Sequence, residues 1–437
     1  MIAFTAPFAG LPVWAQVLFY AALALIVLVL AWTTVLFVLS RKALRSAPAP
    51  DRAAADGLLW VFLVPALDEE VTIADCVERL RGVDAANKAI LVVNDGSTDA
   101  TGEILAGIEA PELEVLERVP PEAKQGKAAA LNAAWRHLET LLASGRWEGW
   151  PRGRIVVVVV DADGRLDPRA PEQIAGHFAD PSVGGVQVLV RIYNRHSPLT
   201  WCQDVEFSIY GLLYQAGRTP WGTAGMGGNG QFNRLAALDA IADEEAGGPW
   251  RDRLTEDQDL GLRLIEAGWR NVSDGRASVD QQGLPLPGRL FRQRTRWAQG
   301  NLQAMAHLGS APRAKLPWLA RADLVAYLLQ PVMQAFVGVV FALSIVLAIL
   351  NVADFWGDDD WWLLVVFFVL GFGGIVLGCI ARGARRGLPG IALGLLIVPV
   401  YAAYSWIVWP VLARAAARQL ARRRGWAKTA RERLPAA

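Results

Sequence analysis

The sequence has few cysteines, few histidines and few charged residues for its length. The 437-residue chain contains three cysteines and four histidines, and 19% of its residues are charged, against about 25% in soluble proteins. Cys76, Cys202 and Cys379 are scattered without metal-type spacing, which argues against a disulfide framework and indicates a reducing compartment. The net charge of +1 argues against nucleic acid as a partner.

The low fraction of charged residues comes from four apolar runs that contain none: Ala15–Ser40, Leu324–Leu350, Trp361–Ile380 and Gly390–Ala413. Each reaches the length of about 20 residues that crosses hydrocarbon as a helix. We therefore predict membrane-spanning helices rather than buried helices of a large soluble protein. The first run is longer than the apolar core of about 7–15 residues in a signal peptide, and no basic residue precedes it. We interpret it as a retained anchor.

Basic residues follow the first run directly, at Arg41, Lys42 and Arg45. By the positive-inside rule they keep the following segment in the cytoplasm, so we predict a multi-pass protein of the plasma (inner) membrane. The link between the second and third runs carries Asp354 and Asp358–Asp360 and no basic residue, which is typical of the outside. Arginines after the third run return the chain to the cytoplasm.

The fourth run conflicts with this topology. A full crossing would place the basic tail outside, against the positive-inside rule. Either this segment, which contains Pro399 and Pro410, does not cross simply, or another C-terminal span is wrong. The predicted organisation is an anchor at 1–45, a cytoplasmic domain at 46–315, membrane helices at 316–413 and a basic tail at 414–437.

Short apolar runs alternate with helical patterns in the middle segment. The runs Leu58–Val64, Ala89–Val93 and Ile155–Val160 predict buried strands. The helical patterns are Val71–Arg81, Thr98–Ile108 and Lys127–Leu142. This alternation predicts an α/β domain with a parallel sheet covered on both faces. In such sheets ligands bind beyond the carboxyl ends of the strands.

Polar motifs follow each predicted strand. Val64–Glu70 follows the first strand, and Asn94–Asp99 follows the second, with Ser97 or Thr98 placed to cap the next helix. Each of these two motifs is equally consistent with an ordinary turn. Asp161 and Asp163 follow the third strand, and two carboxylates so spaced can share Mg²⁺ or Mn²⁺. That cation takes its remaining ligands from water and substrate phosphates.

Four further segments have the composition of a ligand site. Lys124–Lys127 opens a helix and suits phosphate binding, and the glycine-rich Gly225–Arg234, which we expect to enter a helix, lets backbone approach a ligand. Either can also be a solvated loop. Thr255–Asp257 begins a predicted helix, Gln258–Ala267. In the predicted helix Arg289–Leu308, four residues share one face, where tryptophan offers a surface for a sugar ring: Gln293, Arg296, Trp297 and Gly300.

Seven of these motifs occur in an order and spacing that resemble the family 2 glycosyltransferases. They are Val-Pro-Ala-x-x-Glu, Asn-Asp-Gly-Ser-Thr-Asp, Lys-Gln-Gly-Lys with Ala-Leu-Asn, Asp-Ala-Asp, Gly-Gly-x-Gly-x-Phe, Thr-Glu-Asp and Gln-x-x-Arg-Trp. The resemblance is strongest to the membrane-bound processive branch, which includes cellulose, hyaluronan, chitin and poly-N-acetylglucosamine synthases. It implies a GT-A fold with transmembrane helices at both ends and an inverting transfer from a UDP-sugar.

The resemblance also implies roles for individual residues. A nucleoside would be held by Asp95 and the Pro65–Glu69 loop, and its diphosphate by Lys127 and, through the metal, by Asp161 and Asp163. The catalytic set implied is Glu256, Asp257 as general base, Gln293, Arg296 and Trp297. One position departs from the family's usual Asp-Asp-Gly, because Asn94 precedes Asp95. Nucleotide choice is therefore left open.

Three functions compete for this sequence. The first is a polymer-forming synthase whose C-terminal helices help to pass a growing β-linked glycan through the membrane. The second is a non-processive enzyme that glycosylates a membrane lipid such as a diacylglycerol or a polyprenyl phosphate. The third is an inactive nucleotide-sensing scaffold or a transport subunit, which the presence of Asp163, Asp257 and Arg296 disfavours. Partner subunits are common among such synthases, but no segment specifies one.

Overall fold

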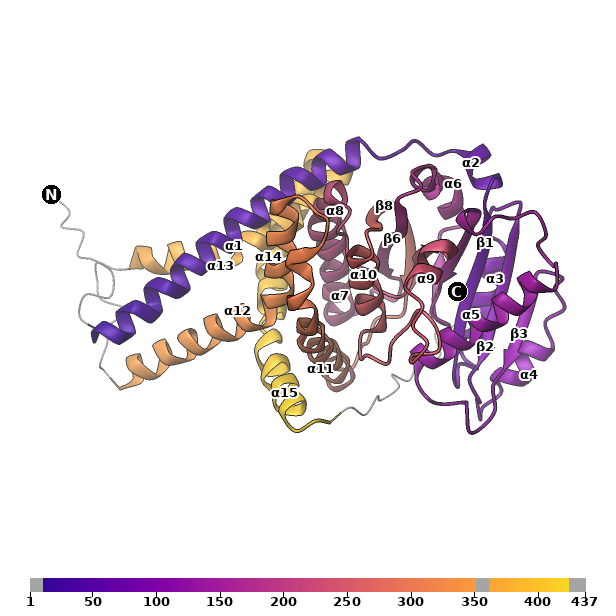
Figure 1. Ribbon diagram of the computed structural model, residues 1–437. Helices are drawn as coiled ribbons and strands as arrows, with labels where there is room; N and C mark the ends of the chain where they lie inside the picture. Colours follow the sequence, from indigo (N-terminus) through magenta and orange to yellow (C-terminus); the bar gives the residue numbers. More distant parts are fainter. Residues whose placement is uncertain (1–10, 351–360, 424–437) are drawn as a thin grey trace.

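A computed structural model describes residues 11–350 and 361–423 of the chain. Its centre is a sheet flanked by helices, and long helices extend from one side of it (Figure 1). The acidic link at Asp354 and Asp358–Asp360 and the tail beyond Arg423 lie outside the described residues, so the predictions for them stay open.

Eight strands in the described part of the chain form one sheet, in the order β3-β2-β1-β4-β7-β6-β8-β5. The strands are β1 (Leu59–Ala66), β2 (Lys88–Asn94), β3 (Leu113–Glu117), β4 (Ile155–Val159), β5 (Arg165–Leu166), β6 (Val183–Ile192), β7 (Gln231–Arg234) and β8 (Arg270–Gln281). The three predicted strands are β1, β2 and β4, which are neighbours in the sheet. Together with β3 they pair in parallel, as the strand–helix alternation predicts.

The other half of the sheet is mixed, which corrects the expectation of a parallel sheet. Strand β7 lies antiparallel between β4 and β6. It begins at Gln231, directly after the glycine-rich loop, which therefore enters a strand rather than a helix. A left-handed backbone at Gly228 and Gly230 turns the chain into β7. Glycines therefore indicated the close approach of backbone here, but not the element that follows it.

Fifteen α-helices are described besides shorter helical segments. They are α1 (Val13–Arg45), α2 (Arg52–Asp56), α3 (Ile73–Arg81), α4 (Thr101–Ala106), α5 (Lys127–Ala143), α6 (Ala170–Ile174), α7 (Pro198–Ile209), α8 (Ala216–Arg218), α9 (Leu235–Ala240), α10 (Glu256–Glu266), α11 (Pro287–Ala304), α12 (Trp318–Ile349), α13 (Trp361–Gly383), α14 (Gly387–Ser405) and α15 (Val408–Leu420). A π-helical turn, η3 (Tyr210–Gln215), continues α7.

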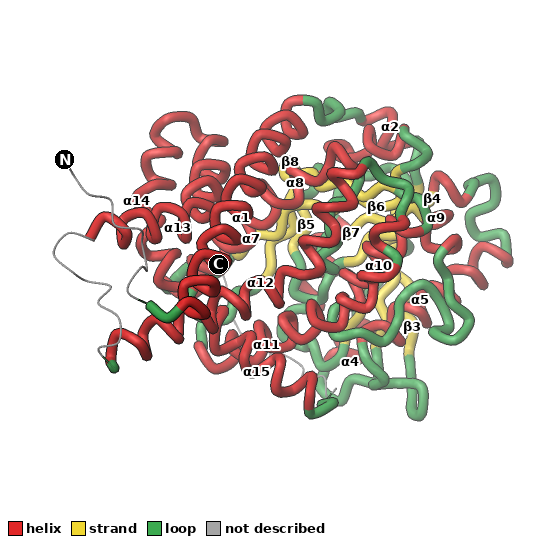
Figure 2. The backbone as a smooth tube through the Cα atoms, turned by 60° about the vertical axis from the view of Figure 1, so that its left-hand side comes forward, coloured by secondary structure: helices red, strands yellow, loops and turns green. Residues whose placement is uncertain are grey.

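The alternation of side chains along β1 creates two cores. Trp60, Phe62 and Val64 point to one face, where α3 packs, and Leu59, Val61 and Leu63 point to the other, where α5 packs. All six side chains are buried. The sheet is thus covered on both faces, as predicted, and Figure 2 shows its strands enclosed between helices.

Three helical stretches in the described residues are long and apolar enough to cross a membrane: Val13–Arg45, Trp318–Ile349 and Val369–Leu420. The third takes in the last two of the four predicted runs. The fourth run is not one helix, because α14 ends at Ser405 and α15 begins at Val408. The break lies between Pro399 and Pro410, in keeping with a segment that does not cross simply.

Buried ion pairs join the long helices to the sheet domain. Arg218 of α8 donates to Asp323 of α12 at 2.6 Å, and Trp32 of α1 donates to the same carboxylate at 2.7 Å. Asp204 of α7 accepts from Arg191 of β6 at 2.8 Å and from Arg382 of α13 at 3.1 Å. These carboxylates fix α1, α12 and α13 relative to the domain.

Candidate active site

The loops that follow β1 and β2 are bonded to each other. Asp68 accepts from the backbone N–H of Thr98 at 2.7 Å, and its own N–H donates to the Ser97 hydroxyl at 2.9 Å. The N–H of Glu69 donates to Thr101 Oγ1 at 2.7 Å. The predicted cap at Ser97 or Thr98 is wrong, because α4 begins after Ala100 without a side-chain cap. Both hydroxyls bind the neighbouring loop instead.

Asp95 lies buried at the end of β2. Its Oδ1 accepts from the Arg118 guanidinium and, at 3.1 Å, from the backbone N–H of Lys124. Burial raises the pKa of Asp95 above its usual value, although both donors act in the opposite direction. Pro65 lies in the neighbouring strand β1, paired with Val93, two residues before Asp95.

Asn94 stands at the position where the family pattern has an aspartate, and its side chain binds the carboxylate of Glu117. Asn94 Nδ2 donates to Glu117 Oε2 at 2.7 Å, and Asn94 Oδ1 accepts from the N–H of Ser97 at 3.2 Å. An aspartate in place of Asn94 would put two carboxylates in contact. The amide is therefore matched to Glu117, a residue 23 positions away that sequence spacing does not single out.

Asp161 and Asp163 follow β4, and the glycine-rich loop lies against them. The N–H of Asp161 donates to Asn229 Oδ1 at 3.1 Å, and Asp163 Oδ2 accepts from the N–H of Gln282 at 2.9 Å. Among the described residues no group of three or more His, Cys, Asp or Glu side chains could hold a metal ion. A cation here would rely on this pair and on ligands from outside the protein.

Lys127, the first residue of α5, joins the Asp161 loop to the start of α10. Its Nζ lies 2.6 Å from Asp161 Oδ1 and 3.4 Å from Glu256 Oε1. Burial lowers the pKa of Lys127, but Asp161 and Glu256 outweigh it and raise the pKa above its ordinary value. The site therefore holds a permanent cation between two carboxylates.

Gly228 of the glycine-rich loop lies next to Lys127 and Asp257. A Cβ atom at this position would lie 2.9 Å from Asp257 Oδ2 and 3.4 Å from Lys127 Nζ. The glycine-rich loop thus leaves no room for a side chain at Gly228, next to the predicted base and the predicted phosphate ligand. Asp161, Lys127, Glu256 and Asp257 meet at one edge of the sheet.

The carboxyl of Asp257 has an unusual environment. Burial, followed by the charge of Glu256, raises its pKa to about 7, while Lys127 and Arg296 act in the opposite direction. Its Oδ1 accepts from the N–H of Gln258 at 2.8 Å. A carboxylate with a pKa near neutrality is suited to accept a proton at physiological pH.

Helix α11 brings the Gln-x-x-Arg-Trp motif against the start of α10. Gly300 provides the contact, because a Cβ atom there would lie 2.5 Å from Thr255 Cγ2. Arg296 is close enough for its charge to act on Asp257. Among the described residues, buried Arg296 Nε has no hydrogen-bond partner, and a charged N–H of this kind fits an anionic oxygen.

Gln293 and Trp297, which belong to the predicted face of α11, both contact Arg294. Arg294 donates to Gln293 Oε1 at 2.6 Å and to Glu206 Oε2 at 2.7 Å. Its guanidinium lies over the Trp297 ring, 4.1 Å from the centroid, so one face of that indole is covered. The ring of Phe207 contacts Trp297 edge-on at 5.9 Å.

Arg294 and Glu206 were not predicted as site residues. Arg294 is more buried than Arg296 and lies outside the face defined by Gln293, Arg296 and Gly300. Its partner Glu206 is 88 residues away and also accepts from Tyr404 of α14 at 2.8 Å. No local motif indicates these contacts, although a second arginine within Gln-Arg-Thr-Arg-Trp was a visible signal.

Known protein families match most of this region. Glycosyl transferase family group 2 matches residues 156–376, just over half of the chain. The chain belongs to this family. Glycosyl transferase family 2 matches residues 61–241, so the two matches together contain the sheet and the residues that meet around Gly228. The family resemblance predicted from the seven motifs is confirmed.

Two named relatives differ in their products. The chain is 29% identical over 275 residues to the beta-monoglucosyldiacylglycerol synthase of Synechocystis sp., which covers 61% of this chain and 53% of that protein. It is 28% identical over 248 residues to the poly-beta-1,6-N-acetyl-D-glucosamine synthase of Staphylococcus aureus, with coverages of 56% and 55%. The chain therefore spans about half the length of the curated relatives it matches.

A solved structure shows the same architecture over nearly the whole chain. The mannosyltransferase from Pyrobaculum calidifontis, in complex with GDP-Man and Mn²⁺, has a TM-score of 0.60 and covers 94% of this chain and 98% of its own. At 21% identity the likeness shows the fold alone. Together with the family match it confirms the GT-A-like fold expected from the sequence.

Proposed function

We propose that this protein transfers a sugar from a nucleoside-diphosphate sugar, with UDP as the expected nucleotide, to a hydroxyl of an acceptor held at the membrane. The observation that carries the proposal is the meeting of Asp161, Lys127 and Asp257 around Gly228, with Arg296 on the opposing helix. Family membership supplies the reaction class.

The donor end of the site is assigned from charge and burial. Asp95 and the Pro65–Glu69 loop lie where a nucleoside would extend from β1 and β2. Asp161 and Asp163 are oxygen ligands suited to Mg²⁺ or Mn²⁺, and the bound cation would neutralise charge on the diphosphate. The orphaned N–H of Arg296 is available for a diphosphate oxygen.

The reaction assigned to the site is a single displacement. Asp257 accepts the proton of the acceptor hydroxyl while the acceptor oxygen forms a bond to the anomeric carbon. The bond from that carbon to the diphosphate oxygen breaks, and the nucleoside diphosphate leaves with the electron pair. Arg296 and Lys127 stabilise the negative charge that develops on it. One displacement inverts the anomeric configuration.

A membrane lipid is the acceptor that we propose first. Helix α12, a candidate membrane span, reaches the site because Gln258, next to Asp257, donates to Tyr327 of α12 at 2.8 Å. This contact supports an acceptor hydroxyl that reaches the base from the membrane surface. A glucosyldiacylglycerol synthase among the relatives supports this acceptor.

A growing β-linked polysaccharide, which the sequence favoured, is the second candidate. The poly-N-acetylglucosamine synthase among the relatives supports it, as does the Gln-x-x-Arg-Trp helix. Incubation of purified membranes with radiolabelled UDP-sugars, followed by sizing of the product, tests the function. A single-sugar lipid supports the first acceptor and a high-mass, glycosidase-sensitive product the second. If no UDP- or GDP-sugar is consumed with Mg²⁺ or Mn²⁺, the proposed function is wrong.

A further inference from the structure

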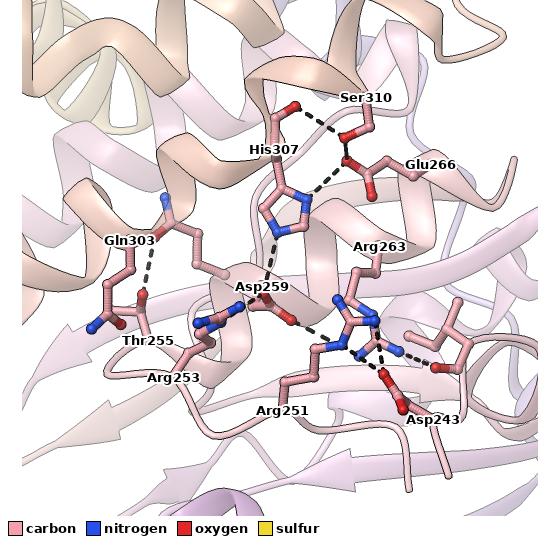
Figure 3. A network of polar contacts seen from close by, with 12 residues as sticks. Asp243, Arg251, Arg253, Thr255, Asp259, Arg263, Glu266, Gln303, His307 and Ser310 are labelled. Atoms are coloured by element: carbon pink, nitrogen blue, oxygen red, sulfur yellow. Dashed lines mark hydrogen bonds and ion pairs between the residues drawn. The ribbon is translucent and has the colours of Figure 1, made fainter. Parts of the chain in front are cut away.

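Outside the site itself, one buried histidine lies where two of its helices meet. His307 follows α11 in the short helical segment η5 (Met305–Gly309). Its Nε2 lies 3.1 Å from Asp259 Oδ1 and its Nδ1 lies 2.9 Å from Glu266 Oε1 (Figure 3). Both ring nitrogens therefore contact carboxylates, and both carboxylates belong to α10.

Both carboxylates lie on one face of the helix that begins with the proposed base. Asp259 and Glu266 are seven residues apart, two turns of α10. Asp259 is two residues from Asp257. His307 thus binds α10 along most of its length, at the point where α11 has just ended.

The contact made by His307 is one of several between these segments, which also pack through apolar side chains. Near the start of α10, Gly300 packs on Thr255, and Gln303 Oε1 accepts from the N–H of Leu254 at 3.1 Å. Unlike the contacts of Gly300 and Gln303, that of His307 joins ionisable side chains on both segments. It therefore adds a charge-dependent contact to the packing between α10 and α11.

A protonated imidazole can donate to both carboxylates at once. Asp259 is also 3.7 Å from Arg253 and 3.9 Å from Arg263, and among the described residues its Oδ2 has no hydrogen-bond partner. Glu266 also accepts from the Ser310 hydroxyl. A neutral imidazole has one N–H and would leave one of the carboxylates without its charged donor.

The rest of the network holds the preceding loop. Arg263 donates to the carbonyl of Pro249 at 2.6 Å and to that of Ile241. Arg251 donates to Asp243 at 2.8 Å. Arg253 lies near Asp259 but, like Arg251 and Arg263, contacts no residue of η5 in these bonds. None of these contacts joins α10 to η5.

We propose that His307 is a positioning residue, an inference that rests on the proposed function. As an imidazolium, His307 fixes α11 to α10 and so places Arg296 relative to Asp257. Burial lowers the pKa of His307, but the hydrogen bonds that its ring donates to Asp259 and Glu266 outweigh this effect and raise the pKa to about 9. The contact therefore persists at neutral pH and is lost as pH rises through about 9.

The test is the pH dependence of transfer in purified full-length protein. In the wild type kcat falls with a midpoint near pH 9. His307→Gln lowers kcat at neutral pH by about 10- to 100-fold, because small misplacement of reacting groups is costly, and its kcat lacks the alkaline fall. His177→Gln is the matched control. It removes the pair of His177 with Asp274, 2.8 Å apart, which involves neither α10 nor α11. This variant should keep the wild-type kcat and the alkaline fall of kcat.

A second variant keeps the proposal testable if His307→Gln does not fold. Glu266→Gln removes one of the two carboxylates, so the alkaline midpoint moves to lower pH. The four histidines of the chain also allow the His307 ring to be titrated directly by NMR. A ring that titrates below about pH 7, or variants with the wild-type pH profile, overturn the proposal. Wild-type protein without any transfer would instead contradict the proposed function, and leaves the NMR result decisive for His307.

Discussion

If Asp257 is the base, as proposed, the burial of this single carboxyl sets the pH at which the site becomes active. Its pKa of about 7 means that the ionised base accumulates as pH rises through neutrality. We expect kcat to increase from about pH 6 to 8 with an apparent pKa near 7. A rate that is independent of pH over this interval would remove Asp257 from the role of base.

The burial of Asp257 also predicts that the protein loses stability over the pH range in which kcat increases. Because the folded-state pKa is raised above the ordinary value of 3.8, ionisation of Asp257 costs stability, and this cost grows as pH rises from about 4 to 7. Asp257→Asn should lower kcat by about 100- to 10,000-fold yet raise Tm at pH 8. A fall in both would indicate a structural role instead. Tm by scanning fluorimetry at pH 5 and 8 separates the two outcomes.

A glycine provides a second test at the residue scale. Gly228→Ala introduces a Cβ atom 2.9 Å from Asp257 Oδ2 at a positive φ of 76°. We expect transfer to fall at least about 100-fold. Gly145→Ala is the control, since φ is 82° there and no atom lies within 4 Å of the added Cβ. Both variants carry a strain of about 1–2 kcal/mol; equal activity in the two would contradict the crowding argument.

At the scale of elements, the contact between α10 and α11 is expected to control catalysis. Gly300→Ala places a methyl group 2.5 Å from Thr255 Cγ2 and should separate the helices, lowering kcat by about 10-fold or more. Gly288→Ala in the same helix meets one side-chain atom at 3.8 Å. It should leave kcat unchanged and can stabilise the helix by about 1 kcal/mol. Steady-state kinetics of both variants decide between local crowding and a general effect of alanine.

The elements that sequence predicted correctly are those with a local signal. Apolar runs identified β1, β2 and β4, and two of the motifs contain Lys127 and Asp257, which lie next to Gly228. The antiparallel β7 was missed because a glycine-rich loop fits the start of either element. The roles of Glu117 and Arg294 were missed because their partners are distant in sequence, and buried ion pairs leave no periodic pattern.

At the scale of the whole molecule, buried ion pairs hold the long helices to the domain. Asp323, which is 1% exposed, accepts from both Arg218 and Trp32. Asp323→Ala leaves Arg218 buried without its partner and should cost about 3–5 kcal/mol. The double variant Arg218→Met/Asp323→Leu should recover most of this loss. A double variant no more stable than Asp323→Ala would show that the pair is not the source of the stability.

The central claim is that Asp163 and Asp257 act at one edge of the sheet. Asp163 binds the donor there, and Asp257 deprotonates the acceptor. The measurement that tests it most directly is donor affinity and single-turnover transfer, determined side by side for Asp163→Asn and Asp257→Asn. We predict that Asp163→Asn weakens Mg²⁺- or Mn²⁺-dependent nucleotide binding, and that Asp257→Asn binds the donor normally without transferring the sugar. Near-wild-type transfer by Asp257→Asn, or unchanged metal-dependent affinity in Asp163→Asn, would contradict it.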